Sequence, residues 1–234
     1  MTSSPNNLPR IALVGGGVHA TVVAGCIRHA GLATVAGYVD VPDHDRDPMR
    51  KMQVAYLGSD HTLAERTAGG EVTHVVLAIA GLHHTALRFA LVQRLDDIAP
   101  RWWTAIHRLA IVDETATIAE GTVVFAGAII NPLARIGRHV VINTGAIIEH
   151  LAVIEDFAVI SPGATLCGGV RIGRGSFVGA GATIITDVKV GPDAIIAAGA
   201  VVLKDVPPGA TVMGNPARIR ESVSPSRHAP VGAP

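Results

Sequence analysis

An aliphatic residue recurs at every sixth position through the second half of this 234-residue chain. The series starts at Val112 and ends at Val202, and its sixteen members are all Val, Ile or Leu. Four positions after each member lies Ala, Thr, Val or Ser. Six-residue repeats of this kind indicate a β-helix, in which short strands are stacked in successive coils.

The spacing within each hexad predicts which side chains point inward. Alternate residues of a strand face the same side, so the small residue and the aliphatic residue two positions later both point into the coil. The positions between strands form corners, where Gly and Asp are common, as at Pro192-Asp193. Three hexads make one triangular coil of about 18 residues, so sixteen hexads predict slightly more than five coils.

A different pattern fills the first half, where apolar strands alternate with helical segments. Strands are predicted at Ile11–Val14, Thr34–Asp40 and His74–Ile79, and helices at Val18–His29 and Thr85–Leu95. Residues 42–53 are predicted to form an exposed loop. Strand, glycine turn, helix and strand make a βαβ unit on a parallel sheet. We therefore expect a disordered N-terminus (1–9), an α/β Rossmann-like domain (10–105), an all-β β-helix (106–220) and a flexible tail (221–234).

Composition narrows the classes of partner. Apolar residues make up 49% of the chain and aromatic residues 3%, which suits an aliphatic core of stacked strands. The 19 basic and 19 acidic residues cancel, so nothing favours nucleic acid or a membrane as partner. We see no bilayer-spanning run and no signal peptide. The two cysteines lack metal-ligand spacing, and we expect buried thiols in a cytoplasmic protein.

One corner of the predicted β-helix carries a residue suited to acid–base chemistry. His150 follows the inward-facing Ile148 by two positions, which places it at a corner outside the prism. A neutral imidazole accepts a proton near neutral pH, so His150 is a candidate general base. The alternative is a solvated surface histidine, since the chain has eleven histidines and His139 also falls at a corner.

A second candidate site lies in the string IALVGGGVHATVV. A glycine-rich turn between a strand and a helix lets the backbone approach a phosphate, and the helix N-terminus favours negative charge. Asp40 ends the second strand, where an acidic residue also fits dinucleotide folds. NAD is therefore an alternative ligand. The small number of predicted strands, about three, argues against it. A structural role is the third alternative.

Residues 142–173, INTGAIIEHLAVIEDFAVISPGATLCGGVRIG, and the ending MGNPAR carry a family resemblance. They resemble the bacterial nucleotide-sugar acetyltransferases of the sialic-acid O-acetyltransferase and bacillosamine or perosamine N-acetyltransferase type. The resemblance covers residues 10–220. It implies a left-handed β-helix that binds acetyl-CoA and an N-terminal domain that binds a nucleotide-sugar. It also implies no metal, and a homotrimer with active sites between subunits.

The resemblance implies roles for residues of the β-helix. His150 matches the family's general base, which takes the proton from the sugar amine or hydroxyl. Gly168 lies eighteen residues later, one coil above His150, and matches a backbone N–H donor to the thioester carbonyl. Asn143 matches a position that contacts the substrate.

Two positions depart from the family pattern. The family commonly has Asp or Glu where this chain has Leu151, and a further histidine where it has Val159. The imidazole is therefore left to be oriented by Glu149, by Glu155 or Asp156, or by nothing.

Binding residues are implied in both halves of the chain. The nucleotide-sugar is expected to contact Gly15, Gly17, His19 and Asp40. The pantetheine of acetyl-CoA is expected to lie along backbone amides near Ala180 and Ala198, and its phosphates are expected to meet Lys204 and Arg218.

These residues leave several functions open. N-acetylation of a nucleotide-linked amino sugar is preferred, because a separate Rossmann-like domain suits binding of the nucleotide part of the substrate, here called the nucleotide handle. The alternatives are O-acetylation of a sugar such as sialic acid, a zinc hydratase of the γ-carbonic-anhydrase type, and a weakly active or non-catalytic trimeric scaffold. The hydratase needs two histidines five residues apart, and no such pair lies on the prism. The nucleotide and the sugar stay undetermined.

Overall fold

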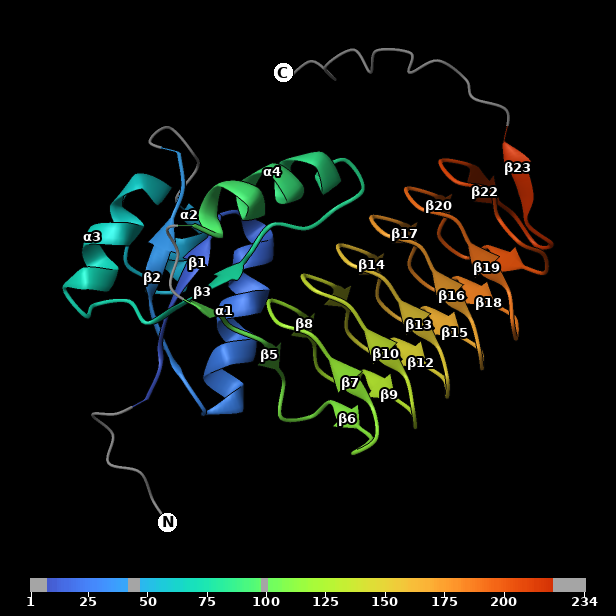
Figure 1. The fold of residues 1–234 in the computed structure, drawn as a ribbon, viewed down its shortest axis with the longest axis horizontal. Coiled ribbons are helices and arrows are strands. Elements are labelled where there is room, and N and C mark those ends of the chain that lie inside the picture. Colours follow the sequence, from blue (N-terminus) through green and yellow to red (C-terminus); the bar gives the residue numbers. More distant parts are fainter. Residues whose placement is uncertain (1–7, 42–46, 98–100, 221–234) are drawn as a thin grey trace.

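The computed structural model describes residues 8–41, 47–97 and 101–220. Within these ranges the chain forms an N-terminal α/β domain followed by a left-handed parallel β-helix (Figure 1), so the predicted fold class is confirmed. Apart from residues 8 and 9, the predicted terminal segments 1–9 and 221–234 lie outside the described residues.

The N-terminal domain is built on a four-stranded parallel sheet. Its strands, in spatial order, are β2 (Thr34–Val39), β1 (Arg10–Val14), β3 (His74–Leu77) and β4 (Arg101–Trp102). Its helices are α1 (Val18–Ala30), α2 (Asp47–Lys51), α3 (Leu63–Ala68) and α4 (Thr85–Leu95), with a 3-10 turn at Asp60–Thr62. The three predicted strands and two predicted helices are confirmed to within two residues at each end.

The prediction of an exposed loop over 42–53 is wrong for the described part of that segment. Residues 47–51 form α2, and the Met49 side chain is fully buried in the core of the domain. A single apolar side chain among charged neighbours gives too little periodicity to predict so short a helix.

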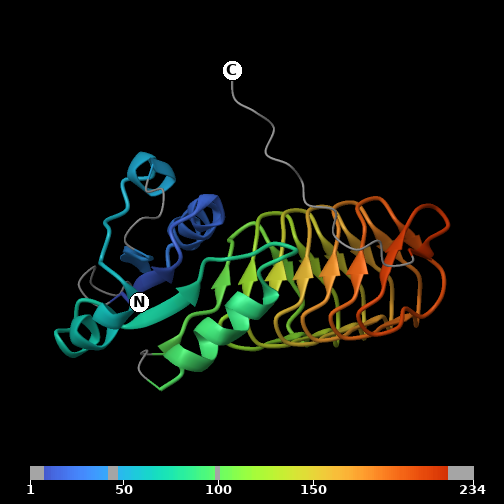
Figure 2. The ribbon, with the colours of Figure 1, turned by 90° about the horizontal axis from the view of Figure 1, so that it is seen from above.

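The β-helix stacks two-residue strands in about six coils (Figure 2). Strands eighteen residues apart pair in parallel, as Val141 does with Val123 and with Val159. The first strand, β5, places Ile106 against the core one hexad before Val112. The stack is therefore slightly longer than the hexad series from Val112 predicts.

Three parallel sheets form the faces of the prism. The first face contains β5 (Ala105–Ile106), β8 (Val123–Val124), β11 (Val141–Ile142), β14 (Val159–Ile160), β17 (Phe177–Val178), β20 (Ile195–Ile196) and β22 (Thr211–Met213), with β23 (Arg218–Arg220) antiparallel at its end. The second contains β6 (Ile111–Val112), β9 (Ile129–Ile130), β12 (Ile147–Ile148), β15 (Thr165–Leu166), β18 (Thr183–Ile184) and β21 (Val201–Val202). The third contains β7 (Thr117–Ile118), β10 (Arg135–Ile136), β13 (Val153–Ile154), β16 (Arg171–Ile172) and β19 (Lys189–Val190).

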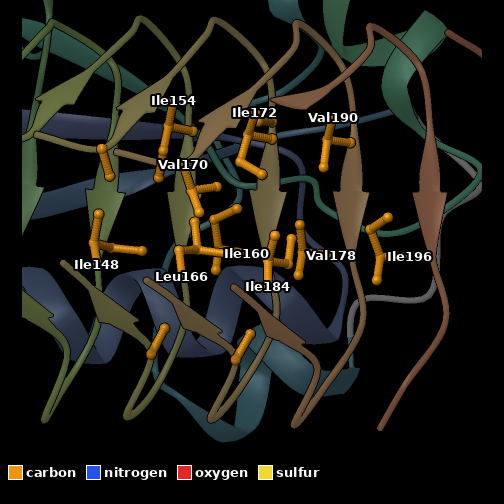
Figure 3. Close-up of a cluster of buried hydrophobic side chains, with 14 of the residues drawn as sticks. Ile148, Ile154, Ile160, Leu166, Val170, Ile172, Val178, Ile184, Val190 and Ile196 are labelled. Atoms are coloured by element: carbon orange, nitrogen blue, oxygen red, sulfur yellow. The ribbon is translucent and has the colours of Figure 1, made fainter. Parts of the chain in front are cut away.

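The two inward positions of each hexad fill the prism, as predicted. Ile148, Ile160 and Leu166 point into this core (Figure 3), and the small residues Ala152 and Ala164 are fully buried beside them. Burying one such aliphatic side chain contributes about 1.5–3 kcal/mol. The repeated core therefore holds each coil on the next and fixes the corners outside it.

The outward residues distinguish the three faces. The first, here the covered face, is buried against the N-terminal domain through Val123, Val141 and Val159. The third, here the charged face, exposes Arg135, Arg171 and Lys189. The second, here the apolar face, carries a row that stays at least partly exposed: Ile111, Ile129, Ile147, Thr165, Thr183 and Val201.

A buried arginine joins the two domains. Arg88 of α4 is 1% exposed, and its Nη1 donates to the carbonyl of Phe157 at 2.7 Å while its Nη2 donates to the carbonyl of His139. Both carbonyls belong to the corner between the charged and covered faces. The His139 ring is buried there against Trp102 and Phe157. His139 thus lies at a corner, but it is not a solvated histidine.

Candidate active site

His150 stands at the corner between the apolar and charged faces, in the turn after β12. The side chain is exposed, and its ring has no hydrogen-bond partner among the described residues. The inward Ile148 before it and Ala152 after it are fully buried. The core therefore anchors the turn on both sides while the imidazole is left accessible to a substrate.

Gly168 lies directly over the His150 ring, as the eighteen-residue period predicts. A Cβ built on Gly168 would stand 2.5 Å from Cε1 and 2.7 Å from Nε2 of His150. The peptide N–H of Gly169 donates to the carbonyl of His150 at 2.9 Å, which fixes the two turns in register. The imidazole thus occupies the space that any side chain at 168 would need.

The backbone N–H of Gly168 has no acceptor among the described residues. At the equivalent turns of the charged face, the N–H of Arg138 donates to Asp156 at 2.7 Å and that of Arg174 donates to Glu155 at 2.9 Å. The amide at Gly168 is therefore open, as are those of Ala180 and Thr186 at the same position of their turns, and the imidazole beside it is what distinguishes Gly168. An open amide beside a base can donate to a developing oxyanion.

None of the predicted carboxylates contacts the His150 ring. Glu155 and Asp156 accept from the amides of the neighbouring turns, so they are committed to the backbone of the other corner. Glu149 lies beside His150 but accepts only from its backbone N–H, at 3.4 Å. Within one subunit, the described residues leave the imidazole unoriented by an acid.

The two departures from the family pattern have different surroundings. Leu151 adopts a left-handed conformation with φ 61° and is 53% exposed beside His150. Val159 is buried on the covered face, away from the His150 corner. An acidic residue at 151 would lie in the same turn as the imidazole, whereas the side chain at 159 lies under the N-terminal domain.

A pocket of about 630 Å³ lies in the N-terminal domain, at the carboxyl ends of β1, β2 and β3. Its lining brings together the four residues predicted to contact a nucleotide-sugar: Gly15, Gly17, His19 and Asp40. One side of α4 forms the opposite wall. Such crevices at the carboxyl ends of parallel strands are the usual ligand sites of open α/β sheets.

Asp40 shapes the glycine turn of this pocket. Its Oδ2 accepts from the N–H of Gly16 at 2.6 Å, and its Oδ1 accepts from the N–H of Val41 at 2.7 Å. Gly15 has φ 107°, a conformation that strongly favours glycine, and a Cβ there would meet Ile79 at 2.5 Å. The turn is therefore held in a form that exposes the start of α1 to the pocket.

His19 is a neutral side chain in the pocket wall. Burial, with a smaller contribution from the charge of Arg88, lowers its pKa to about 4. Its ring packs edge-on against Phe125 of the β-helix, and its buried Nε2 has no hydrogen-bond partner within residues 8–41, 47–97 and 101–220. A neutral imidazole at this place can hydrogen-bond a ligand without adding charge.

The remaining predicted residues divide between the two edges of the apolar face. Lys204 stands in the column of His150 and Gly168, three coils above His150. Asn143, Ala180 and Ala198 lie at the opposite edge, in turns that follow strands of the covered face. Arg218 lies in β23 and is exposed. A single subunit therefore does not bring all these residues to one place.

The sequence reasoning missed several features of this region. Outward residues of the same face lie eighteen positions apart in the sequence. Comparing residues at that spacing would have distinguished an apolar face from a charged face. Arg88, Asp60 and Arg94 carry no local motif that marks their contacts. Cys26 is buried, but the expectation of two buried thiols is wrong for Cys167, which is partly exposed because it takes the outward position after Leu166.

The described residues contain no cluster of three or more His, Cys, Asp or Glu side chains able to hold a metal ion. Among the same residues, no helix combines the length and apolar character needed to cross a bilayer.

Known proteins share both the repeat and the whole fold. The family model described as "Bacterial transferase hexapeptide (six repeats)" matches residues 151–186 and 172–204. A GDP-perosamine N-acetyltransferase variant from Caulobacter crescentus, solved with CoA and GDP-perosamine, is 33% identical with a TM-score of 0.83, covering 91% of this chain and 97% of that chain. The acetyltransferase domain of PglB from Neisseria gonorrhoeae FA1090, solved with acetyl coenzyme A, is 28% identical with a TM-score of 0.81, covering 92% and 100%. No curated protein matches in sequence.

Proposed function

This chain belongs to the bacterial nucleotide-sugar acetyltransferases with hexapeptide repeats, and we propose that it transfers the acetyl group of acetyl-CoA to the amine of a nucleotide-linked amino sugar. The observation that carries the proposal is the pairing of the accessible His150 ring with the open amide of Gly168, one coil above. The relatives with CoA bound support acetyl-CoA as the donor, and the GDP-perosamine in one of them supports an amino sugar as the acceptor.

The proposed step uses both groups of the His150 corner. The neutral amine nitrogen attacks the thioester carbonyl carbon, and His150 takes the proton that the nitrogen loses. The N–H of Gly168 donates to the oxygen that becomes negative in the tetrahedral intermediate. Collapse breaks the C–S bond, the protonated imidazole returns its proton to the sulfur, and the products are the amide and free CoA.

The pocket of the N-terminal domain supports a nucleotide handle. Its glycine turn precedes α1, whose N-terminal amides favour a phosphate, and Asp40 and His19 lie within the same wall. This arrangement suits the diphosphate and ribose of a nucleotide-sugar. A dinucleotide such as NAD has less support, because the described sheet has only four strands.

We further propose that the apolar face packs against other copies of this chain in a homotrimer. Exposed aliphatic side chains gather along it and its two edges: Leu109, Ile111, Leu133, Leu151, Ile185 and Leu203 are 37–64% exposed. Exposing such a strip of apolar side chains to water is unfavourable, and exposed apolar patches commonly mark protein–protein interfaces. The charged face of the same prism, with Arg135, Arg171 and Lys189 outward, suits solvent instead.

The position of the pocket supports a shared site. α4, which walls the pocket, meets the β-helix at the corner between the charged and covered faces, where the hydroxyl of Thr85 donates to the carbonyl of Gly175 at 3.4 Å. His150 lies at the other edge of the charged face. We infer that a sugar held in the pocket reaches the His150 of a neighbouring subunit. Asn143, at the edge of the apolar face opposite to His150, is inferred to contribute to the same shared site.

Incubating the full chain with acetyl-CoA and UDP-, GDP- or dTDP-linked amino sugars tests the proposal, with release of free CoA thiol as the readout. One of these acceptors should support turnover, and His150→Ala should abolish it. His29→Ala, which removes an exposed histidine at the end of α1, is the control and should retain activity. Undiminished turnover by His150→Ala would exclude His150 as the base, and turnover only with hydroxyl acceptors would favour O-acetylation.

The shared site is tested by breaking the trimer. Light scattering should give a trimer for the full chain, and Ile147→Glu on the apolar face should reduce it to monomer and remove activity. Arg171→Glu, on the charged face, is the matched control and should leave the trimer intact. A fully active monomer would contradict the shared site but not the reaction.

A further inference from the structure

One end of the nucleotide pocket carries an ion pair that binding of the phosphates does not require. Asp60 and Arg94 both line the pocket, and Nη2 of Arg94 contacts Oδ2 of Asp60. The Asp60 side chain is only 16% exposed, and the Arg94 side chain is 53% exposed. A carboxylate accepts at about four lone-pair sites and a guanidinium has five N–H donors, so the pair leaves both groups able to bind a ligand.

The pocket has a direction set by α4. His84, Leu87, Leu91 and Arg94 line it, and their spacing places them along one side of the helix over roughly 15 Å. α4 lies along the β-helix, from Thr85 beside Gly175 to Asp96, which follows the helix and is 3.6 Å from Arg138. Asp60 lies in the 3-10 turn that immediately precedes α3, which lies on the side of the N-terminal domain away from the β-helix (Figures 1 and 2). The reacting sugar must point toward a β-helix, so the nucleobase belongs at the Asp60–Arg94 end.

The walls at that end suit an aromatic base. Leu91 lies one turn before Arg94 on the same side of α4, and Val41, which follows Asp40, is 62% exposed. Both side chains line the pocket, and they offer apolar surface to a flat ring. A bound base would remove this surface from water, which favours binding by the hydrophobic effect.

The ion pair matches the edge of guanine. Guanine presents an acceptor, O6, beside two donors, N1–H and N2–H₂, so it needs one donor and one paired acceptor from the protein. Arg94 supplies the donor and Asp60 the acceptors. Uracil and thymine present carbonyl oxygens on both sides of a single N–H, so one of their oxygens would face the carboxylate of Asp60.

We propose that the nucleotide handle is a guanosine diphosphate and that Asp60 and Arg94 select it by reading the guanine edge. The assignment rests on the function proposed above and names the nucleotide of that same pocket. Asp40 holds the glycine turn through the N–H groups of Gly16 and Val41.

Calorimetric binding of nucleoside diphosphates to the full chain tests the assignment. GDP should bind at least tenfold more tightly than UDP or dTDP, and tenfold more tightly than IDP, which lacks only the 2-amino group that Asp60 accepts from. The comparison of GDP with IDP uses the unaltered protein, so it does not depend on the folding of a variant.

Asp60→Asn provides the reciprocal test. An asparagine amide can donate to the 2-oxo group of xanthine, so this variant should lose its preference for GDP and bind XDP more tightly than GDP. The matched control is Glu71→Gln, which removes the carboxylate of another surface ion pair, with Arg66, outside the pocket. The control should keep the GDP preference of the unaltered protein.

The outcomes separate this inference from the proposed function. Equal binding of UDP or dTDP and GDP, or of IDP and GDP, would overturn the guanine assignment and leave the nucleotide handle in place. A GDP preference unchanged in Asp60→Asn would also overturn it. Binding of none of the nucleotides would contradict the proposed function and the guanine assignment together.

Discussion

His139 and His150 occupy corners of the same prism, yet their surroundings are opposite. The His139 ring is 1% exposed, stacked on Phe157 and edge-on to Trp102, and neither of its ring nitrogens has a hydrogen-bond partner in the described part of the chain. The His150 ring is exposed under Gly168, next to an amide that is free to donate. The repeat sets both positions, and the N-terminal domain decides which one meets solvent.

The two corners also differ in protonation and in anchoring. Burial, followed by the charges of Arg138 and Arg88, lowers the pKa of His139 to about 4, so this ring is neutral at pH 7 and packs as an aromatic group. Burial lowers the pKa of Arg88 to about 10, which leaves it charged at pH 7 and bonded to the corner's carbonyls. One corner is therefore a docking site for α4, and the other is available for chemistry.

Replacing each histidine should give the largest contrast. His150→Gln should lower kcat by roughly 10²- to 10⁴-fold, because a general base contributes on that scale. His139→Phe should leave kcat at pH 7 unchanged, since Phe157 already occupies the equivalent turn one coil later at φ 62°. Steady-state kinetics with circular dichroism on both variants checks this. Similar losses of kcat in both would remove the distinction between the corners.

Breaking the docked corner should have the next largest effect. Arg88→Met leaves the carbonyls of Phe157 and His139 without their donors, and it should lower the free energy of unfolding by about 2–4 kcal/mol. Arg28→Met, which removes one exposed hydrogen bond to Met52, should cost less than about 1 kcal/mol. Urea denaturation measures both, and equal costs would mean that Arg88 does not hold the domains together.

Filling the space above His150 should have a smaller effect on catalysis. Gly168→Ala places a Cβ within 2.5 Å of the imidazole, so the ring must move, and kcat should fall about 10- to 100-fold. Gly25→Ala in α1, where a Cβ meets nothing within 4 Å, is the matched control and should keep full activity. A fully active Gly168→Ala would show that the position of the ring under this glycine is not needed.

The smallest effect is expected in the pH dependence of stability. His139 and His19 have folded pKa values near 4, below the unfolded value of about 6.5, so the unfolded chain binds their protons more readily. Stability should be nearly complete above pH 6.5 and fall as the pH drops toward 4, by about 2 kcal/mol for each histidine at pH 5. His139→Phe should flatten this profile in urea denaturation at pH 5 and 7. An unchanged slope would show that His139 is not buried in solution.

Much of this molecule follows from local sequence. The hexad period placed Ile148 and Ile160 inside the prism and Gly168 over His150, because each coil repeats the geometry of the last. The glycine turn and Asp40 were predicted for the pocket because strand, turn and helix are consecutive in the chain. Met49 was missed, since a five-residue helix with one buried side chain leaves no period to detect.

What the sequence by itself determined is the register: which residues point inward, which stand at corners, and which corners stack. Every corner obeys the same period, so the period cannot tell a covered corner from an open one. Only the docking of α4 buried His139 under Arg88 and left His150 exposed, and only the packing of α4 against the 3-10 turn placed Arg94 beside Asp60. Those contacts join residues 34 to 69 positions apart, and long-range packing of that kind leaves no periodic trace in the chain.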